Sequence, residues 1–192
     1  VGHFRWKWLP LLSKGAYLAL PRFLNFPAYL IFIFILIFTP MHLRVSVSAQ
    51  RLDLVDDHGR VTRSFPVSTA KKGTGSEPDS HKTPLGWHRV CAKIGDGAAA
   101  GTQFVGRKPT GRVWKSTDPV EEKNLVLSRI LWLDGEEPQN RTSKDRYIYI
   151  HGTNREDLIG TPASAGCVCL KNSDVIELYD LVPNGTRVEI VA

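Results

Sequence analysis

Hydrophobic residues after Ala49 alternate with polar residues in short runs that Gly, Pro, Asp and Asn interrupt. A period of two places successive side chains on opposite faces of a β-strand, so the pattern predicts a mainly β domain. Residues 108–111 (KPTG) are expected to form a turn between two short strands. The expected strands cover residues 51–55, 60–69, 87–94, 103–106, 112–115, 124–133, 146–150 and 186–191.

One segment, residues 172–182, has a helical pattern of apolar positions. Asp174 precedes Glu177 at the spacing of a capping box, and residues 183–185 (PNG) end the helix. These elements together predict a single β-barrel or sandwich with one or two short helices.

The N-terminal segment has the features of an export signal. Residues 28–38 (AYLIFIFILIF) form an apolar core that follows basic residues and precedes Val47-Ser48-Ala49. This core is shorter than the roughly 20 residues of a membrane span, which favours a signal peptide cleaved before Gln50. An uncleaved membrane anchor is the alternative. We therefore expect a leader over 1–49 and one domain over 50–192, in the periplasm or extracytoplasmic cell wall.

The net charge of +6 belongs mainly to the leader. Five of the 25 basic residues and no acidic residue lie in residues 1–49, which leaves 20 basic and 19 acidic residues beyond them. Nucleic-acid binding requires a clustered positive surface, so this balance gives no support for a nucleic-acid partner.

Residues 151–172 (HGTNREDLIGTPASAGCVCLKN) contain the candidate chemistry. An expected strand delivers His151 to its end, and Cys167 follows sixteen residues later. A thiol attacks as its thiolate, and a neighbouring imidazole can take the proton and return it to a leaving amine. The other imidazole nitrogen requires an acceptor, for which a backbone carbonyl near Gly152 is suitable. Gly166 would let the backbone N–H groups of residues 166 and 167 approach an oxyanion, and the Ser164 hydroxyl could also donate there.

Two alternatives compete with this hypothesis on spacing alone. Cysteine is commonly buried in protein cores, so Cys167 and His151 could be an unrelated pair. A zinc site of His151, Cys167 and Cys169 is less favoured, because a C-x-C spacing is atypical and no fourth ligand is evident. No metal or cofactor is therefore expected. Trp87, Trp114 and Trp132 alternate with apolar neighbours, which favours a place in the core over a sugar-stacking platform.

The segment resembles the signature of the L,D-transpeptidase family, the YkuD-type catalytic domain. That signature has a His-Gly at a strand end, then Ser-x-Gly-Cys, a hydrophobic residue, usually Arg, and an Asn. Upstream, Pro66-Val67-Ser68-Thr69 and Thr83-Pro84-Leu85-Gly86-Trp87 are similar to the family's early strand and Thr-Pro-x-Gly turn, so the resemblance spans residues 51–191. The signature matches are His151-Gly152, Ser164, Gly166-Cys167, Val168 and Asn172.

Two positions depart from the signature. Ala165 stands where histidine is frequent, and Cys169 stands where arginine is usual. An arginine there would suit a substrate carboxylate through bidentate hydrogen bonds, so Cys169 puts substrate affinity or specificity in question. An odd number of cysteines leaves at least one thiol free. A disulfide between Cys91 and Cys169 that leaves Cys167 free is one hypothesis.

The resemblance implies acyl transfer on peptidoglycan stem peptides by a monomeric enzyme without a cofactor. Cys167 would be the nucleophile, His151 its base with Gly152 as the orienting residue, and a 3→3 cross-link the product. Water as acceptor would give an L,D-carboxypeptidase, and a protein lysine an anchoring enzyme. A peptidoglycan-binding domain without turnover is the alternative from another class. The expected oxyanion and substrate-binding residues are Ser164, Gly166, Val168 and Asn172.

Overall fold

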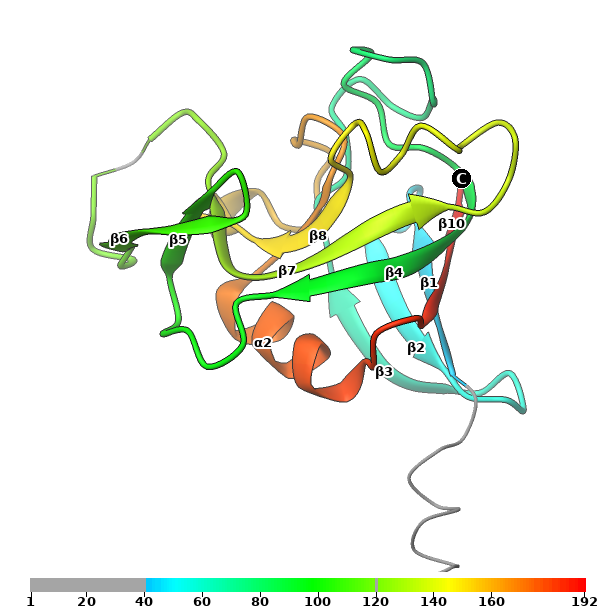
Figure 1. Cartoon of the computed structure of the whole chain (residues 1–192), viewed down its shortest axis with the longest axis horizontal. Coiled ribbons are helices and arrows are strands. Elements are labelled where there is room, and N and C mark those ends of the chain that lie inside the picture. The colour runs from blue at the N-terminus through cyan, green and yellow to red at the C-terminus, as the bar shows by residue number, and fades with distance from the viewer. Residues whose placement is uncertain (1–40, 120) are drawn as a thin grey trace, which may run out of the picture. The chain divides into compact units, whose positions relative to one another are not determined.

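The structure is a computed structural model that describes residues 41–119 and 121–192. One α-helix, α2 (Asn172–Leu181), and one 3-10 turn, η1 (Glu156–Leu158), accompany ten strands in this part of the chain (Figure 1). The expected mainly β class with a short helix is confirmed. The strands are β1 (His42–Ser46), β2 (Arg51–Val55), β3 (Val61–Pro66), β4 (Gly86–Ile94), β5 (Thr102–Val105), β6 (Lys108–Val113), β7 (Val126–Gly135), β8 (Tyr149–Gly152), β9 (Val168–Leu170) and β10 (Arg187–Val191).

These strands form one open, mixed sheet. Its main path runs β3-β2-β1-β10-β4-β7-β5-β6, and β8 branches from β7 to pair with β9. The β1–β10 and β8–β9 pairs are parallel, and the other pairs are antiparallel. The branch places β8, with its histidine, directly beside the strand that follows Cys167.

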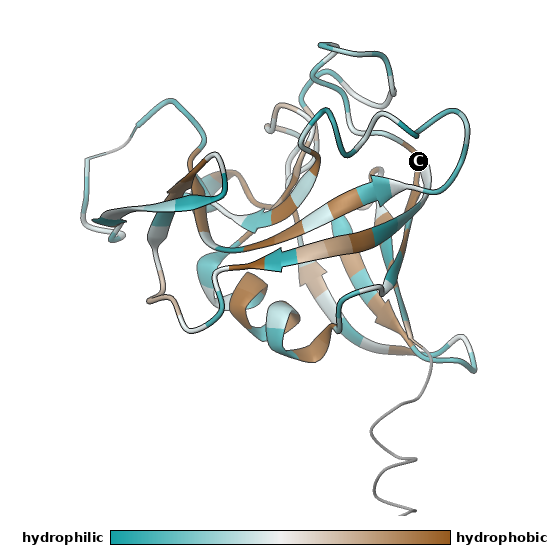
Figure 2. Cartoon of the chain, in the orientation of Figure 1, coloured by the Kyte–Doolittle hydropathy of each residue, from teal (hydrophilic) through white to brown (hydrophobic). Residues whose placement is uncertain are grey.

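The core lies between the sheet and α2, which contacts β7 and β8. Figure 2 shows hydrophobic positions on the strands around α2 and on the helix itself. Val175 and Leu178 of the helix are fully buried, as are Leu131 and Ile150 of β7 and β8. Each such side chain contributes about 1.5–3 kcal/mol when it leaves water. This packing fixes the positions of β7 and β8 and therefore of the residues at their ends.

The domain begins earlier than the sequence analysis expects. Strand β1 lies within the expected leader, yet it is hydrogen-bonded between β2 and β10. Its Leu43 and Val45 are completely buried. Cleavage before Gln50 would remove this strand from the middle of the sheet, so the boundary between residues 49 and 50 was placed too late. The expected signal core, residues 28–38, lies outside the described residues.

The turn before β6 was also misplaced. Residues 108–111, expected as a turn, begin β6, and the reversal occurs at Gly106-Arg107 with φ of 54° and 66°. Positive φ at both central residues is typical of a type I′ hairpin turn. The usual sequence signal for this turn is Asn-Gly, and a Gly-Arg pair does not indicate it.

The helix begins with a different cap from the expected one. Asp174 lies inside the first turn of α2 and does not cap it. The carboxylate of Glu156, from η1, accepts the backbone N–H of Asn172 at 2.7 Å, so a residue distant in sequence satisfies this end. Among the described residues, no helix is long and apolar enough to cross a membrane.

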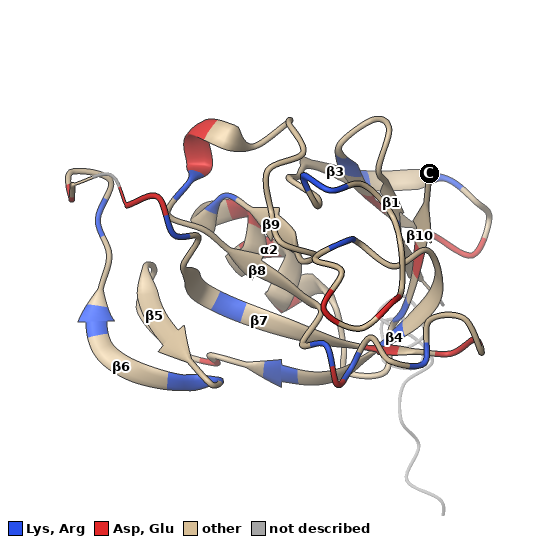
Figure 3. Ribbon diagram, turned by 90° about the horizontal axis from the view of Figure 1, so that it is seen from above, with Lys and Arg blue, Asp and Glu red and all other residues tan. Residues whose placement is uncertain are grey.

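Basic and acidic residues are scattered over the whole ribbon in Figure 3. Many of them form ion pairs at the surface, such as Arg112 with Glu121 and Arg187 with Glu136. This distribution agrees with the near-balance of charge beyond residue 49.

Candidate active site

The parallel ladder of β8 and β9 brings the candidate residues together. Ile150 pairs with Val168, and His151 pairs with Cys169. Side chains alternate across a strand, so His151 and Cys169 share one face of the ladder while Val168 and Ile150 point into the core. Cys167, two residues before Cys169, lies on the same face as both.

The His151 ring is held in one tautomer. Its Nδ1 lies 2.8 Å from the carbonyl oxygen of Gly152, and because a carbonyl only accepts, Nδ1 must carry the hydrogen. Nε2 is therefore the free acceptor. The side chain is 2% exposed, and burial lowers the pKa of His151 to about 4, against the smaller opposing effect of the Gly152 bond. The imidazole is neutral at physiological pH.

The sulfur in contact with Nε2 belongs to Cys169, at 3.6 Å. Asn124 donates from Nδ2 to the same sulfur at 3.1 Å, and Thr153 donates from Oγ1 to Asn124 Oδ1 at 2.6 Å. Burial raises the pKa of the Cys169 thiol far above its ordinary value. The protonated thiol donates to Nε2, so Thr153, Asn124, Cys169 and His151 form one hydrogen-bonded chain.

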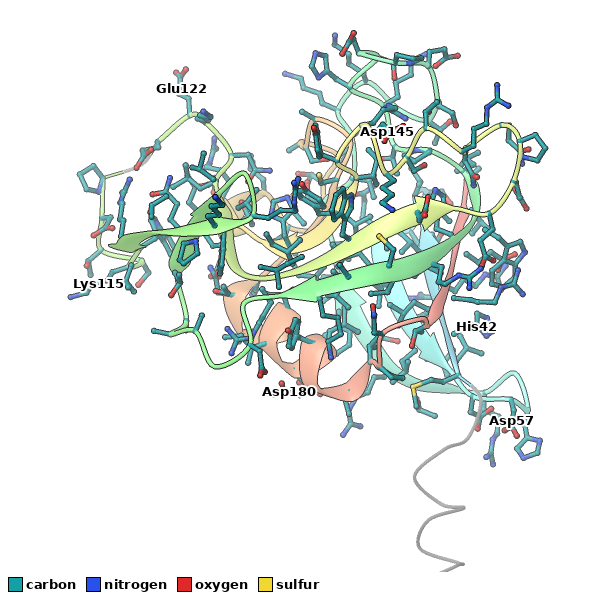
Figure 4. All side chains as sticks on the ribbon, in the orientation of Figure 1. His42, Asp57, Lys115, Glu122, Asp145 and Asp180 are labelled. Atoms are coloured by element: carbon teal, nitrogen blue, oxygen red, sulfur yellow. The ribbon has the colours of Figure 1, made fainter. Side chains whose placement is uncertain are left out.

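Cys169 also lines a small cavity between β9 and the loop that precedes β7. The cavity has a volume of about 40 Å³, and Glu122, Asn124 and Ser164 also line it. Figure 4 labels Glu122 on this loop, which joins β6 to β7. A space of this size holds water but not a peptide. Cys169 is itself 1% exposed, so a peptide does not reach its sulfur in this conformation.

Cys167 has a different environment. It is half-buried, its Sγ accepts the backbone N–H of Tyr149 at 3.4 Å, and it lies 3.5 Å from the carbonyl oxygen of Tyr147. Burial raises the pKa of Cys167 to about 11, while the Tyr149 N–H and the charge of Arg146 act in the opposite direction. Within the described residues, no hydrogen bond joins Cys167 to His151 directly.

Ser164 and Gly166 shape the turn before Cys167. Ser164 Oγ donates to the carbonyl of Cys167 at 2.6 Å and accepts the N–H of Gly166 at 3.3 Å. Gly166 has a φ of +123°, where a side chain would be strained, and a Cβ would lie 3.3 Å from Ile148 Cδ1. The expected donation by Ser164 to an oxyanion is not available in this conformation, because its hydroxyl hydrogen is engaged within the turn.

The two upstream motifs hold this turn in place. The backbone of Ser68 exchanges two 2.9 Å hydrogen bonds with Cys169, and Thr69 O accepts the N–H of Ser164 at 2.9 Å. Thr83 donates from Oγ1 to the carbonyl of Gly166 at 3.0 Å. Segments 66–69 and 83–87, distant in sequence from Cys167, therefore position its loop.

Asn172 does not face a substrate as the sequence analysis expects. Its Nδ2 donates to Thr153 O at 2.9 Å and to Glu156 Oε1 at 2.7 Å. Its Oδ1 accepts from Ser128 Oγ at 2.6 Å. With these partners the buried amide joins β7, the loop after β8 and the start of α2, which is a structural role.

Val168 and Gly152 are also explained by packing. Val168 is fully buried in the core, on the side of β9 opposite to the sulfurs, so it cannot bind substrate. A Cβ on Gly152 would lie 2.5 Å from Asn172 Oδ1 and 2.8 Å from Leu127 O, distances that leave room only for glycine. Gly152 therefore lets β8 approach β7 and α2 while its carbonyl orients His151.

The cysteines are not paired. Cys91, Cys167 and Cys169 are all free, so the hypothetical disulfide between Cys91 and Cys169 is not formed. Cys91 lies on β4 and lines a separate groove with Asp134 and Gly185. In residues 41–119 and 121–192, no three His, Cys, Asp or Glu side chains cluster in a way that could hold a metal ion.

An aromatic row extends from the site to the surface. Trp132 and Tyr147 are stacked with ring centroids 6.2 Å apart, Tyr149 meets Trp132 edge-on at 6.0 Å, and His151 meets Tyr149 edge-on at 6.4 Å. Trp132 is partly exposed, contrary to its expected place in the core, and Tyr147 is 55% exposed. The sequence analysis missed this row, although Tyr147, Tyr149 and His151 follow the period of two.

Comparisons with known proteins agree on one family. A model of the YkuD L,D-transpeptidase catalytic domain matches residues 40–190. Putative L,D-transpeptidase YkuD of Bacillus subtilis is 30% identical over 151 residues, which cover 79% of this chain and 66% of that protein. Probable L,D-transpeptidase ErfK/SrfK of Salmonella typhimurium is 50% identical over 46 residues, 24% of this chain and 15% of that protein.

Solved structures share the fold. An L,D-transpeptidase structure from Xylanimonas cellulosilytica aligns with a TM-score of 0.52 and 21% identity, over 80% of this chain and 61% of that one. LdtMt1 in complex with imipenem aligns with a TM-score of 0.50 and 18% identity, over 80% of this chain and 59% of that one. The chain thus spans about two thirds or less of these relatives. From the family match and the shared fold, the chain belongs to the YkuD family of L,D-transpeptidase catalytic domains.

Proposed function

We propose that this domain is a cysteine-dependent L,D-transpeptidase that acts on peptidoglycan tetrapeptide stems, with Cys167 as nucleophile and His151 as base. The observation that carries the proposal is the shared face of β8 and β9. There, the half-buried thiol of Cys167 lies two residues before Cys169, the strand partner of His151, whose neutral imidazole directs Nε2 toward the Cys169 sulfur. Cys169 is 1% exposed, so Cys167 is the thiol that a peptide can reach.

The proposed reaction has two acyl-transfer steps. Cys167 Sγ attacks the carbonyl of the third stem residue, and its proton passes to Nε2 of His151. The imidazolium returns the proton to the amine of the departing D-alanine, which leaves a thioester on Cys167. The amine of a second stem then attacks the thioester and gives its proton to His151. The imidazolium returns this proton to the departing Cys167 sulfur as the 3→3 cross-link forms and the C–S bond breaks.

The pKa values support proton transfer during attack. A His151 pKa of about 4 and a Cys167 pKa of about 11 make the neutral thiol and neutral imidazole the resting pair. Because Nε2 contacts Cys169 in the resting state, Cys167 must move toward Nε2 when substrate binds. Catalytic hydrogen bonds are often long before substrate binds and shorten in the complex. The oxyanion would be bound by the backbone N–H of Cys167, and by that of Gly166 once it leaves Ser164 Oγ.

The setting of this reaction is part of the proposal. The leader expected in the N-terminal segment would export the domain to the periplasm or cell wall, with an inner-membrane anchor if the leader is retained. There the enzyme would act as a monomer, without metal or cofactor.

A second candidate is a peptidoglycan-binding domain without turnover. Two observations favour it: cysteine replaces the family's usual arginine at position 169, and that cysteine engages Nε2 of His151 at 3.6 Å. Water as the acyl acceptor would instead make the domain an L,D-carboxypeptidase.

One experiment separates these functions. The full chain is incubated with a disaccharide-tetrapeptide and the products are read by mass spectrometry, beside Cys167→Ala and the control Cys91→Ala. We expect dimers that lack one D-alanine with the wild type and Cys91→Ala, and none with Cys167→Ala. Tripeptide alone would identify a carboxypeptidase. Absence of both product and thioester would reject the enzyme and leave the binding domain.

An inhibitor supplies an independent probe of the nucleophile. The structure of LdtMt1 with imipenem makes a carbapenem the natural choice. Intact mass of this chain should increase by one imipenem in the wild type and Cys91→Ala, and remain unchanged in Cys167→Ala. An adduct that persists in Cys167→Ala would place the reactive sulfur elsewhere.

A further inference from the structure

Arg107 occupies an unusual backbone position at the tip of the β5–β6 hairpin (Figure 1). Its φ is +66°, in the left-handed region that a long side chain rarely adopts. The second position of such a turn is normally glycine, and another residue there costs about 1 kcal/mol or more. The arrangement around its side chain suggests why arginine is found at this position.

The guanidinium of Arg107 is folded back onto the aromatic row. Its Cζ lies 4.3 Å from the ring centroid of Trp132 and 5.4 Å from that of Tyr147. Its Nη1 donates to the hydroxyl of Tyr149 at 3.1 Å. A guanidinium over aromatic rings uses its face for the contact and keeps its N–H groups at the edge, where they remain able to bind an oxyanion.

No internal acid neutralises this group. Among the ion pairs of the described residues, none includes Arg107, whereas Arg112 on the same hairpin pairs with Glu121 at 2.7 Å. Arg146, whose charge lowers the pKa of Cys167, already donates hydrogen bonds to the carbonyls of Gly75 and Lys82. Arg107 is therefore a positive group beside the site with donor capacity left over.

Tyr149 connects Arg107 to the nucleophile. Its backbone N–H donates to Cys167 Sγ at 3.4 Å, and its hydroxyl accepts from Arg107 at the other end of the side chain. The guanidinium and the sulfur thus contact opposite ends of the same tyrosine. Tyr147, whose carbonyl lies 3.5 Å from the same sulfur, exposes its ring beside this path. A substrate acylating Cys167 would pass over this aromatic surface.

The separation selects among the carboxylates of a stem peptide. Consecutive Cα atoms lie about 3.8 Å apart, so the terminal carboxylate, one residue beyond the attacked carbonyl, stays close to Cys167. A carboxylate at the end of a long side chain on the third residue reaches about as far as a tyrosine does. This is the group whose position matches Arg107.

We propose that Arg107, held on Trp132 and Tyr147, is a specificity-determining residue that binds the side-chain carboxylate of the third residue of the donor stem. The inference rests on the proposed function of Cys167.

The test compares two donor tetrapeptides that differ only in a carboxylate or a carboxamide at the end of the third side chain. With the full chain, Arg107→Gln should lower kcat/KM for the carboxylate donor about 10- to 100-fold, the loss expected for a charge-assisted hydrogen bond. Its kcat/KM for the carboxamide donor should match the wild type. Arg107→Lys should retain part of the preference for the carboxylate donor over the carboxamide donor. The control Arg112→Gln should retain all of it.

Equal loss on both donors, or none on either, would overturn the inference. Alkylation of Cys167 by iodoacetamide at the wild-type rate would show that Arg107→Gln leaves the site folded.

If the wild type turns over neither donor, the proposed function fails, and binding to Cys167→Ala is followed by tryptophan fluorescence. If Cys167→Ala binds the carboxylate donor more tightly than the carboxamide donor, and the double variant Cys167→Ala/Arg107→Gln does not, the role of Arg107 is still supported. Equal binding of both donors to Cys167→Ala would reject it.

Discussion

Nε2 of His151 lies 3.6 Å from Sγ of Cys169, not in contact with the sulfur of Cys167. Both residues are nearly fully buried, and the tautomer set by Gly152 leaves Nε2 as the acceptor of the Cys169 thiol. Cys169 is therefore a residue that orients the imidazole from the side opposite to Gly152. The contact gives Cys169 an orienting role and leaves the proposed attack to Cys167, two residues earlier.

Cys169→Ser should keep transpeptidation within about fivefold of the wild type, because a serine hydroxyl can donate to Nε2 in place of the thiol. Cys167→Ala should abolish it. Dimer formation by mass spectrometry measures both. The reverse outcome, activity in Cys167→Ala and none in Cys169→Ser, would make Cys169 the nucleophile.

Alkylation of Cys167 by iodoacetamide should accelerate about tenfold per pH unit from pH 7 to 10. With a pKa of about 11 the thiolate is a small fraction that grows in this proportion over that range. Intact-mass kinetics with Cys91→Ala measure the rate. A rate that is constant from pH 6 would instead indicate a preformed thiolate–imidazolium pair.

His151 should make the domain sensitive to acid. Its pKa is lowered from 6.5 to about 4 in the folded state, so the unfolded chain binds more protons between these values. The free energy of unfolding should therefore be unaffected by this group above pH 6.5 and decrease by about 3 kcal/mol as the pH falls to 4.

Urea denaturation at several pH values measures this dependence. His151→Gln should flatten the decrease, while His58→Gln, in an exposed turn, should leave it unchanged. An equally steep decrease in His151→Gln would assign the acid sensitivity to other groups.

Gly152→Ala should destabilise the fold by about 1–3 kcal/mol, because the new Cβ would overlap Asn172 Oδ1 and Leu127 O. Gly59→Ala is the matched control, since a Cβ there meets no atom within 4 Å and only the positive φ opposes it. Thermal unfolding measures both. A smaller loss for Gly152→Ala than for Gly59→Ala would contradict the tight contact between β8 and α2.

Leu43→Ala should destabilise the domain by about 2–5 kcal/mol, the range for a large buried side chain cut to alanine. The exposed Arg44→Ala on the same strand is the control and should change stability little. Urea denaturation measures both. Equal small effects would mean that β1 is not part of the stable domain.

Features that depend on neighbours along the chain were predictable from the amino-acid pattern alone. Alternating residues predicted β2, β4 and β10, and the pattern over 172–182 predicted α2. The segment from His151 to Asn172 also indicated the family, because its His-Gly and Gly-Cys motifs are contiguous and ordered. Local periodicity defines which side chains share a face of a strand or helix, and the predicted strands and helix required nothing else. The family was indicated by the resemblance of one contiguous segment.

Features that depend on pairing between distant segments became visible only in the folded domain. Period two does not specify which strand is the neighbour or at which register, so the sequence could not place β1 inside the sheet or Cys169 opposite His151. Likewise, Arg107 reaches Tyr149 of β8 only because β5 and β8 both pair with β7. The residues that hold the Cys167 loop by hydrogen bonds, among them Thr69, Thr83 and Tyr149, are distant in sequence, and only the folded sheet brings them together.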